Sequence, residues 1–256
     1  MNLQSRDRRE RNYEYTKKLD YSIHYSIWHK TTTEYVEKLA KIYIKDFFSR
    51  LFKKFKISNK NLKILDVGAG FGFCVYALNK MGYDAFGIDI NPQMVDVAKK
   101  LGIKVELIED TISWLFNNPE KFDVIIAFDV LEHVPVTDEY EFCRAIYHSL
   151  KKPGVLIAQV PNANASFACR FRYIDFTHCN SFTEHSIYFL LKNAGFEEIE
   201  VEEIKPELRL RPRPFLAFIL LKFFRFLRRL EAVAEFGSYG FKMPLSLNIR
   251  VVAWKK

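Results

Sequence analysis

The chain has 256 residues, of which 49% are hydrophobic and 27% charged, and its formal net charge is +8 at pH 7. This composition suits one globular domain with a full hydrophobic core. Residues 205–230 hold eight cationic residues and one acidic residue, so they contribute +7 and the rest of the chain only +1. Such a local patch argues against a protein that binds nucleic acid.

The first 30 residues are polar and aromatic, and they contain no apolar stretch of the signal-peptide kind. The four cysteines form no C-x-x-C pair, which suits a reduced, cytoplasmic protein. His178, Cys179 and His185 lack the paired short spacing of structural zinc ligands, so no metal is predicted.

The first predicted elements are a helix over 31–55, a buried strand over 62–67 and a helix over 71–80. The turn between the last two places Asp66 two residues before a G-x-G-x-G run. Glycines in such a turn let backbone N–H groups approach a small polar cofactor. A dinucleotide fingerprint requires G-x-G-x-x-G, and no Lys-Ser/Thr pair follows as in a P-loop. Taken alone, the run is also compatible with a turn that binds no ligand.

Polar residues follow the next two predicted strands. The strand over 84–88 stops at Asp89, whose carboxylate can accept two hydrogen bonds from ribose hydroxyls. Asn91-Pro92 then begins a helix that runs to about residue 100. The strand over 105–108 is followed directly by Asp110 and Thr111.

The strand predicted over 122–128 is almost continuously apolar, as a strand covered on both faces must be. Alternating strands and helices predict an α/β fold, with a mostly parallel sheet and helices on both faces. Ligands in such sheets bind at the carboxyl ends of the strands. The remaining elements are a helix over 138–150 that begins with a D-x-x-E capping box, a turn over 151–154, a strand over 155–160, a helix from Thr183 to Gly195, and strands over 196–204 and 247–254.

These motifs, in this order and at strand ends, resemble the class I S-adenosylmethionine-dependent methyltransferases. The resemblance covers about residues 60–200 and includes the run D-V-L-E-H-V at 129–134, which matches the L-E-H-V segment common in the superfamily. It implies a Rossmann-like sheet of seven strands whose last strand is antiparallel. It also implies S-adenosyl-L-methionine as the cofactor and S-adenosyl-L-homocysteine as the product.

The resemblance implies that Asp66 helps to hold the amino group of the cofactor. Ile90 and Met94 are expected to flank the adenine. The expected cofactor-binding residues are Asp66, Gly68, Ala69, Gly70, Phe71, Gly72, Asp89, Ile90, Met94, Asp110, Thr111, Asp129, Val130 and His133.

A hydroxyl acceptor needs a base, and neutral histidine suits that role near pH 7. We expect His133, His178 and Asp175 to be catalytic, although His133 can instead shape its loop or contact the cofactor, and His178 can be purely structural. Residues 175–183 resemble the D-P-T-H-x-x-x-F-T segment of bacterial methyltransferases of sugar and surface-polysaccharide biosynthesis. Phe176 replaces the proline of that segment.

Four residues are expected to bind the acceptor. Asn162 directly follows the fifth strand and can orient an acceptor hydroxyl. Arg170 and Arg172 can bind a phosphate or carboxylate, the alternative being two solvated arginines. Tyr173 lies in the same region.

Residues 215–230 read as a helix with Lys222, Arg225, Arg228 and Arg229 on one face. The segment is too short and too charged to span a membrane. A basic amphipathic helix can lie in a membrane interface. The alternatives are packing over the sheet or the acceptor site, or burial in a homodimer. The R-P-R-P run at 211–214 predicts a stiff turn before it.

We therefore expect an N-terminal helical cap (1–58), a cofactor-binding core (59–204), a basic helical insertion (205–246) and a final core strand (247–256). The expected activity is metal-independent O-methylation of a sugar, sugar-phosphate or nucleotide-sugar intermediate of capsule or lipopolysaccharide synthesis. We place it in the cytoplasm or at the inner face of the membrane. The alternatives are a small-molecule or lipid-quinone methyltransferase and a non-catalytic cofactor-binding module.

Overall fold

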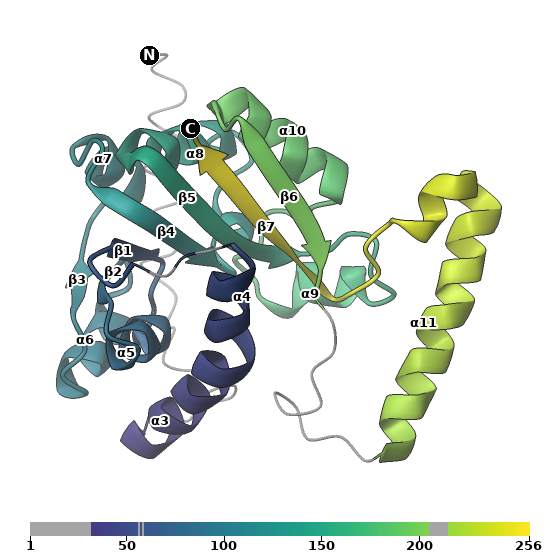
Figure 1. Ribbon diagram of the computed structural model, residues 1–256, viewed down its shortest axis with the longest axis horizontal. Coiled ribbons are helices and arrows are strands. Elements are labelled where there is room, and N and C mark those ends of the chain that lie inside the picture. Colours follow the sequence, from purple (N-terminus) through teal and green to yellow (C-terminus); the bar gives the residue numbers. More distant parts are fainter. Residues whose placement is uncertain (1–31, 56, 58, 205–214) are drawn as a thin grey trace.

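A seven-stranded sheet forms the centre of the molecule (Figure 1). The computed structural model describes residues 32–55, 57, 59–204 and 215–256. Its strands follow the order β3-β2-β1-β4-β5-β7-β6, and β7 runs antiparallel to both of its neighbours. This confirms the predicted fold class. The strands are β1 (Lys63–Val67), β2 (Asp84–Asp89), β3 (Val105–Leu107), β4 (Phe122–Phe128), β5 (Leu150–Pro161), β6 (Glu198–Glu203) and β7 (Asn248–Lys255).

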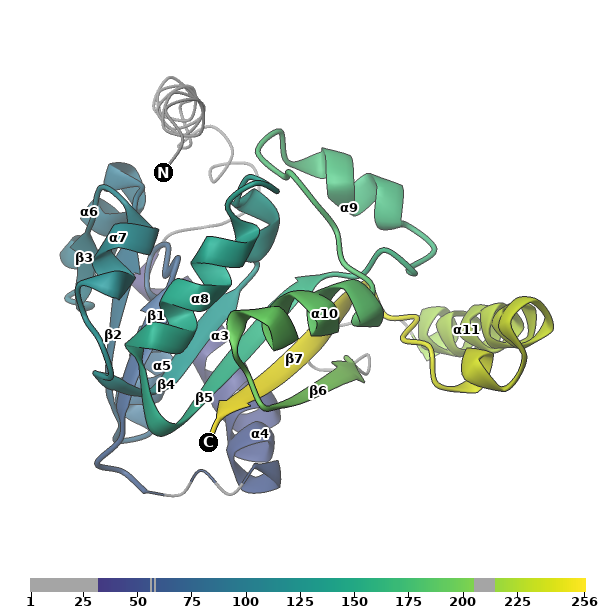
Figure 2. The same ribbon diagram turned by 90° about the horizontal axis from the view of Figure 1, so that it is seen from above.

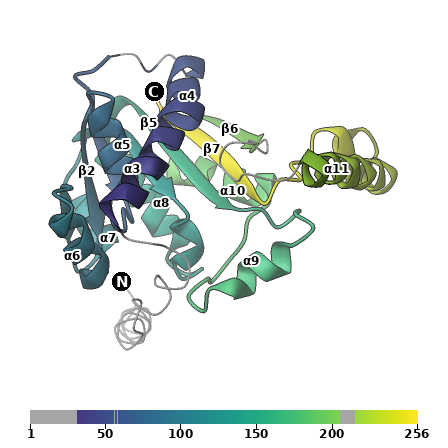
Figure 3. The same ribbon diagram turned by 90° about the horizontal axis from the view of Figure 1, so that it is seen from below.

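Helices cover both faces of the sheet, because the central strands present apolar side chains to each side. In β4, Val124 and Ile126 enter one apolar cluster, whereas Ile125 and Ala127 enter the other. Figures 2 and 3 show the two helical layers from opposite directions. One layer contains α3 (Thr33–Ile42), α4 (Ser49–Lys54), α5 (Phe73–Lys80) and α6 (Pro92–Lys100), and the other contains α7 (Thr111–Phe116), α8 (Glu139–Ser149) and α10 (Glu184–Ala194).

The described part of the predicted N-terminal cap belongs to the main core. Val36 and Phe52 lie in the same apolar cluster as the strands. The predicted helix over 31–55 is interrupted by a π-helical segment, Tyr43–Phe48, between α3 and α4. Within that segment, the ring of Phe48 stacks on Phe128 with centroids 6.3 Å apart. This contact fixes the helical layer at the carboxyl end of β4.

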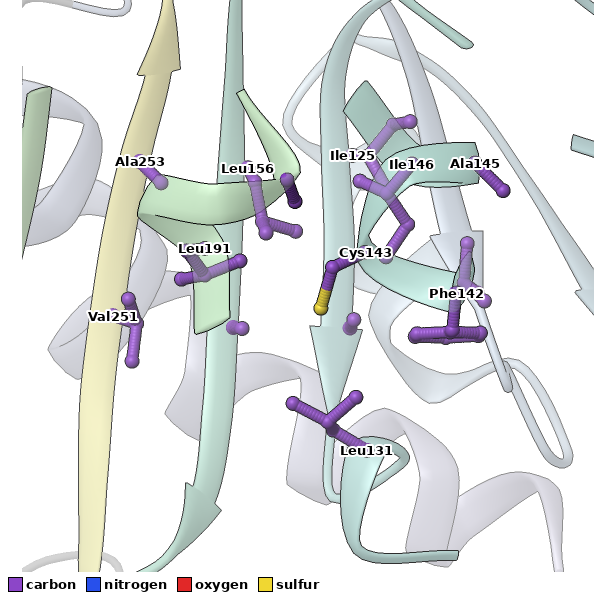
Figure 4. Packing of buried hydrophobic residues seen from close by; sticks show 14 of the residues in the cluster. Ile125, Leu131, Phe142, Cys143, Ala145, Ile146, Leu156, Leu191, Val251 and Ala253 are labelled. Atoms are coloured by element: carbon purple, nitrogen blue, oxygen red, sulfur yellow. The ribbon is translucent and has the colours of Figure 1, made fainter. Parts of the chain in front are cut away.

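The chain after β4 is fixed by an apolar side chain. Leu131 begins a short 3-10 helix, Leu131–His133, and is buried in the cluster formed with α8 (Figure 4). In that cluster it lies with Phe142 and Cys143, among other side chains. Because Leu131 is fixed in the core, the next two residues are held at the carboxyl edge of the sheet.

Three local predictions differ from the structure. Residues 151–154, predicted as a turn, lie within β5, where Gly154 pairs with Lys255 of β7 and the register with β4 shifts between Phe122 and Val124. Asp138 does not cap α8 with its side chain, since its own backbone is already helical (φ −111°, ψ −9°) rather than extended. Two helices were not predicted, α7 and α9 (Ala168–Ile174), because neither is long enough to show an apolar period.

A long helix, α11 (Phe215–Phe236), stands beside the sheet rather than on either face (Figures 1 and 2). It extends six residues beyond the predicted end at residue 230. The predicted turn at 211–214 lies outside the described residues, as do residues 1–30. Within the part of the chain that is described, no helix has the length and apolar character needed to cross a membrane.

Candidate active site

The three glycines after β1 all adopt left-handed backbone conformations, with φ of +66° at Gly68, +55° at Gly70 and +81° at Gly72. L-residues with side chains rarely adopt these angles. Two backbone hydrogen bonds fix the turn. Ala69 donates its N–H to the carbonyl of Ile88 at 3.0 Å, and Gly72 donates to Ala69 at 2.8 Å. The predicted turn is therefore formed at the junction of β1, β2 and α5.

The three glycines are required for different reasons. A Cβ on Gly68 would lie 2.5 Å from Val130, and one on Gly72 would lie 2.6 Å from Ile103. These two glycines therefore allow the turn to pack on its neighbours. A Cβ on Gly70 would meet no atom within 4 Å. Gly70 thus borders open space, where a ligand can approach the backbone.

This difference predicts separate effects of two substitutions. Gly70→Ala should lower the free energy of unfolding only by the cost of its backbone conformation, about 1–2 kcal/mol, while weakening cofactor binding at least about 10-fold. Gly68→Ala adds a clash with Val130 of about 1–3 kcal/mol and should destabilise the protein more. Thermal melts and isothermal titration with S-adenosylmethionine check both effects. Equal destabilisation by both variants, with unchanged binding, would contradict this assignment.

Asp89, the last residue of β2, joins the glycine turn to the next helix. Its carboxylate accepts hydrogen bonds from the N–H of Gly70 and from the N–H of Asn91, each at 2.7 Å. Asn91 in turn caps α6 through its side chain. A carboxylate has about four acceptor sites, so Asp89 can orient the turn and still accept hydrogen bonds from a ligand.

The carboxyl groups of Asp66 and Asp89 lie close to each other at the carboxyl edge of the sheet. Burial raises the pKa of Asp66 well above its ordinary value, and the charge of Asp89 raises it further. Burial also raises the pKa of Asp89, although three backbone N–H groups partly oppose the shift. A cationic ligand would compensate these charges, which fits a donor carrying an ammonium and a sulfonium group.

Several other predicted cofactor residues have a clear place in the structure. Ile90 is exposed next to Asp89, whereas Met94 is only 3% exposed and packs in the core, which leaves little of it to contact a ligand. Asp110 caps α7 by accepting from the N–H groups of Ile112 and Ser113. Among the others, Ala69 and Phe71 are buried in the turn, Val130 packs over Gly68, and Thr111 begins α7.

Asp129 ends β4 in a left-handed conformation with φ of +54°, which is uncommon for a residue with a side chain. Its carboxylate accepts hydrogen bonds from Gln159 on β5 and from Asn248 on β7. Both strands lie on the side of β4 opposite to β1. The expected role in cofactor binding is therefore not supported by these contacts.

The structure brings His133, His178 and Asp175 into one polar cluster. The imidazole centroids of His133 and His178 are 4.6 Å apart in an edge-to-face arrangement. Nδ1 of His133 lies 2.8 Å from the hydroxyl of Thr177, which donates to Asp175 at 2.7 Å. The carbonyl of Glu132 accepts the N–H of Cys179 at 2.6 Å, which attaches the 175–183 loop to the segment after β4.

The hydrogen bonds indicate which ring nitrogen carries the proton in each neutral histidine. Nδ1 of His178 lies 2.6 Å from the carbonyl of Phe171, and a carbonyl can only accept, so this nitrogen carries the hydrogen. The Thr177 hydroxyl already donates to Asp175, so it accepts from Nδ1 of His133. Both neutral imidazoles therefore have their lone pair on Nε2.

Glu132 is a functional candidate that the sequence reasoning did not assign. Its side chain is 1% exposed, and Oε2 has no hydrogen-bond partner among the described residues. Burial raises the pKa of Glu132 well above its ordinary value, and the nearby charge of Asp129 adds to the shift. The sequence feature that could have indicated Glu132 is its position directly before His133 in the L-E-H run.

The predicted acceptor residues differ in their availability. Asn162 is buried and donates its side-chain amide to the carbonyls of Pro244 and Ser246, so both amide hydrogens are committed within the fold. These contacts do not support the prediction that its amide orients an acceptor hydroxyl. Arg172 donates to the carbonyl of His178 and shapes the loop. Arg170 and Tyr173 are exposed on α9.

The strand order, the glycine turn after β1 and the acid at the end of β2 together define an S-adenosylmethionine-dependent methyltransferase fold. The chain belongs to a family described as a methyltransferase domain, whose model matches residues 35–201. A solved S-adenosylmethionine-dependent methyltransferase from Archaeoglobus fulgidus has the same fold. It is 18% identical, with a TM-score of 0.59, and the match covers 81% of this chain and 92% of that one.

Curated relatives are ubiquinone biosynthesis O-methyltransferases. The protein from Azorhizobium caulinodans is 34% identical over 114 residues, which cover 43% of this chain and 44% of the relative. The protein from Cereibacter sphaeroides is 28% identical over 156 residues, which cover 55% and 62%. The chain thus spans about half the length of the curated relatives it matches. The expected nearness to sugar methyltransferases finds no support in these relatives.

The pKa shifts predict how cofactor affinity depends on pH. Binding a cation favours the ionised carboxylates, so it releases protons, and affinity should rise as the pH rises from the ordinary aspartate pKa of 3.8 towards the raised pKa values of Asp66 and Asp89. In the absence of cofactor the same shifts lower folding stability as pH rises through this window, because the folded state binds the protons more tightly than the unfolded state. Titration calorimetry in buffers of different ionisation enthalpy measures the release.

Asp66→Asn is the matched variant for this test. It removes a buried charge, so the cofactor-free variant should be at least as stable as the original chain, while proton release and the rise of affinity with pH should shrink. Cofactor affinity that is independent of pH in the original chain would contradict the assignment of Asp66 and Asp89.

Proposed function

We propose that this methyltransferase transfers the methyl group to a phenolic hydroxyl on the ring of a quinone precursor. The polar cluster carries the proposal, because it holds two histidine lone pairs at the segment that follows β4, whose Val130 packs over Gly68 of the glycine turn. The names of the curated relatives support the same acceptor class. This was the alternative reading of the sequence, and it replaces the sugar acceptor as the preferred one.

The reaction requires the acceptor to lose a proton. A new O–C bond forms as the C–S bond of the sulfonium breaks, which yields a methyl ether, S-adenosylhomocysteine and one proton. Alignment of the two reactants contributes about 7–11 kcal/mol in favourable cases. We place the loss of the proton at the cluster of His133 and His178, with Asp175 and Thr177 holding His133 in orientation.

The loop that resembles a sugar-methyltransferase segment has local structural contacts. Asp175 accepts from the backbone N–H and the hydroxyl of Thr177. Arg172 contacts the backbone of His178. These groups shape the loop around the two histidines, and this use does not depend on a sugar acceptor.

A competition assay tests the acceptor class. The purified chain is incubated with labelled S-adenosylmethionine and a panel of catechols with and without a prenyl chain, nucleotide sugars, sugar phosphates and amines. Methyl ether formation on the catechol ring, in a one-to-one ratio with S-adenosylhomocysteine, is expected. Transfer only to a sugar or an amine would overturn the proposal, and binding of the donor without any transfer would favour a non-catalytic module.

An acceptor that is attached to a lipid would be consistent with the exposed apolar surface of α11. The structure alters the predicted basic face, because Arg225 and Arg229 form ion pairs with Glu203 at the end of β6 and thereby attach the helix to the sheet. Arg228 pairs with Glu231 on the helix itself. We propose that the exposed apolar side chains contact a membrane surface peripherally. They are Phe215, Leu216, Ile219, Leu220, Phe223, Phe224, Phe226, Leu227, Leu230 and Phe236.

Three of the four arginine and lysine side chains of α11 are paired with acids. Binding of the protein to vesicles should therefore depend on the apolar side chains of this helix more than on lipid charge. The double variant F223S/L227S should lower co-sedimentation with phosphatidylcholine vesicles several-fold. Phe189→Ser, at an even more exposed apolar site on α10, serves as the control. Vesicle binding that is unchanged in the double variant would overturn the membrane contact, and a loss of dimer instead would indicate a second copy of the chain as the partner.

A further inference from the structure

Residues 175–183, called the acceptor loop from here on because they carry His178, are held at their carboxyl end by the segment that follows β5. Phe182 donates its backbone N–H to the carbonyl of Pro161 at 2.9 Å. The carbonyl of Phe182 accepts the N–H of Ala163 at 2.8 Å. The position of the acceptor loop therefore depends on how the segment after β5 is held.

Glu184 joins the acceptor loop to two distant segments. It is the first residue of α10 and directly follows Thr183, whose side chain caps this helix. Its Oε2 accepts a hydrogen bond at 2.7 Å from the side-chain amide of Asn164, in the segment after β5. Its Oε1 accepts from the hydroxyl of Tyr239, which lies in the 3-10 helix Gly237–Phe241 that follows α11. One carboxylate thus connects segments that are 20 and 55 residues away from it.

The α11 arm, defined as α11 and this 3-10 helix, packs as one unit beside the sheet (Figure 1). Gly240 lies so close to α11 that a Cβ on it would be 2.3 Å from the carbonyl oxygen of Ala232. Arg229 donates to the carbonyl of Gly240 at 2.8 Å, and it forms an ion pair with Glu203 of β6 at 3.1 Å. The arm is therefore attached to the sheet and can hold Tyr239 in a defined place.

The α11 arm contacts Glu184 and its neighbours at three points. Besides the hydroxyl contact of Tyr239 with Glu184, the ring of Tyr239 stacks on His185 with centroids 5.1 Å apart. Arg228 donates to the backbone carbonyl of Asn164 at 3.3 Å. Partial burial and the Glu184 carboxylate raise the pKa of Tyr239, so its hydroxyl keeps its hydrogen and donates. The amide nitrogen of Asn164 can only donate, so both partners require an acceptor at Glu184.

We propose that Glu184 is a positioning residue for the methyl acceptor. Through its carboxylate, the α11 arm and the segment after β5 together hold the acceptor loop where His178 meets the reacting hydroxyl. Small displacements of a reacting group lower the rate of a transfer strongly, so the support of this loop affects the reaction. The inference rests on the proposed function, which places the acceptor at the histidines. It assigns to the arm a part in acceptor binding without contact with the acceptor.

Two variants remove the contacts of Glu184 with little change in shape. Tyr239→Phe removes the hydroxyl and keeps the ring that stacks on His185. Glu184→Gln leaves one oxygen, which cannot accept from both donors. Each should raise the KM for the catechol acceptor about 5–10-fold and leave the affinity for S-adenosylmethionine within about twofold of the original. Tyr188→Phe, at an exposed tyrosine of the same helix, is the matched control and should leave both constants unchanged.

A rescue variant separates positioning from a general loss of structure. In N164D/E184Q the new amide donates to the new carboxylate, and the amide oxygen still accepts from Tyr239, at unchanged net charge. The KM for the acceptor should return to within about twofold of the original. The double variant E184Q/Y239F should be no weaker than the weaker of its single variants, because both act through one carboxylate, whereas independent effects would multiply.

Hydrogen exchange measures the position of the acceptor loop without any acceptor, so its failure is separate from failure of the proposed function. In Tyr239→Phe the backbone amides of Ala163 and Phe182 should exchange at least about threefold faster, whereas those of β4 should exchange as in the original chain. Unchanged exchange at both amides, an unchanged KM in both single variants, or no recovery in N164D/E184Q would overturn the proposal. If the chain does not methylate the catechol, the exchange result alone decides it.

Discussion

Replacing His133 with alanine is expected to lower kcat by about 10²- to 10⁴-fold while leaving the affinity for S-adenosylmethionine within about threefold of the original. Its Nδ1 is held through Thr177 by Asp175, so the lone pair of the neutral ring, which can accept the proton of the acceptor, is on Nε2. Accepting this proton assists the transfer step and leaves donor binding largely intact. Steady-state assays with the catechol acceptor, together with calorimetry, separate the two effects.

His148→Ala is the control for this prediction, since His148 lies on α8 against Phe116, outside the polar cluster. It should leave kcat within about twofold of the original. A His133→Ala variant that keeps full kcat but loses donor affinity would show that His133 contacts the cofactor, which was the other role open to it from the sequence. That outcome would mean that the polar cluster does not activate the acceptor.

Replacing Asp89 with alanine should have the opposite pattern, with donor affinity falling about 10²- to 10³-fold. The carboxylate makes two hydrogen bonds of 2.7 Å that orient the glycine turn, and each hydrogen bond to a charged group contributes about 1.5–3 kcal/mol. Calorimetry and the KM for S-adenosylmethionine measure the loss. At saturating donor, kcat should recover to within about tenfold of the original.

Asp84→Ala, at the exposed start of the same strand, is the matched control, and it should leave donor binding unchanged. Asp89→Asn keeps the shape of the side chain but removes the charge, so its effect should lie between those of the alanine variant and the original chain. Equal loss of affinity in Asp84→Ala would mean that the effect reflects stability of β2 and not the glycine turn.

The expected cofactor-binding residues at the carboxyl edge of the sheet could be predicted from the sequence because each lies within a few residues of the end of a strand. The glycine turn lies within a few residues of β1, and Asp89 directly ends β2, so a parallel sheet brings both to one edge. The hydrogen bond between Asp89 and Gly70 was not predicted, since it depends on the exact position of two neighbouring strands. Asp110 shows the limit of this reasoning, because a strand-end acid can equally be a helix cap.

The acceptor side could not be predicted in the same way because its contacts join distant segments. The amide of Asn162 is committed to Pro244 and Ser246, which lie more than 80 residues further along the chain. The basic face of α11 is paired with Glu203 across residues 205–214, which are not described. A helical pattern indicates which residues share a face, but it does not indicate which neighbour that face meets.

The most direct test of the central claim is a single-turnover measurement with enzyme in excess over a catechol acceptor and at saturating S-adenosylmethionine. We predict that Asp89→Ala recovers most of the original rate of methyl ether formation, whereas His133→Ala remains slower by about 10²-fold or more. This result would place donor binding at the glycine turn and acceptor activation at the polar cluster. A His133→Ala variant with the original single-turnover rate would contradict the account.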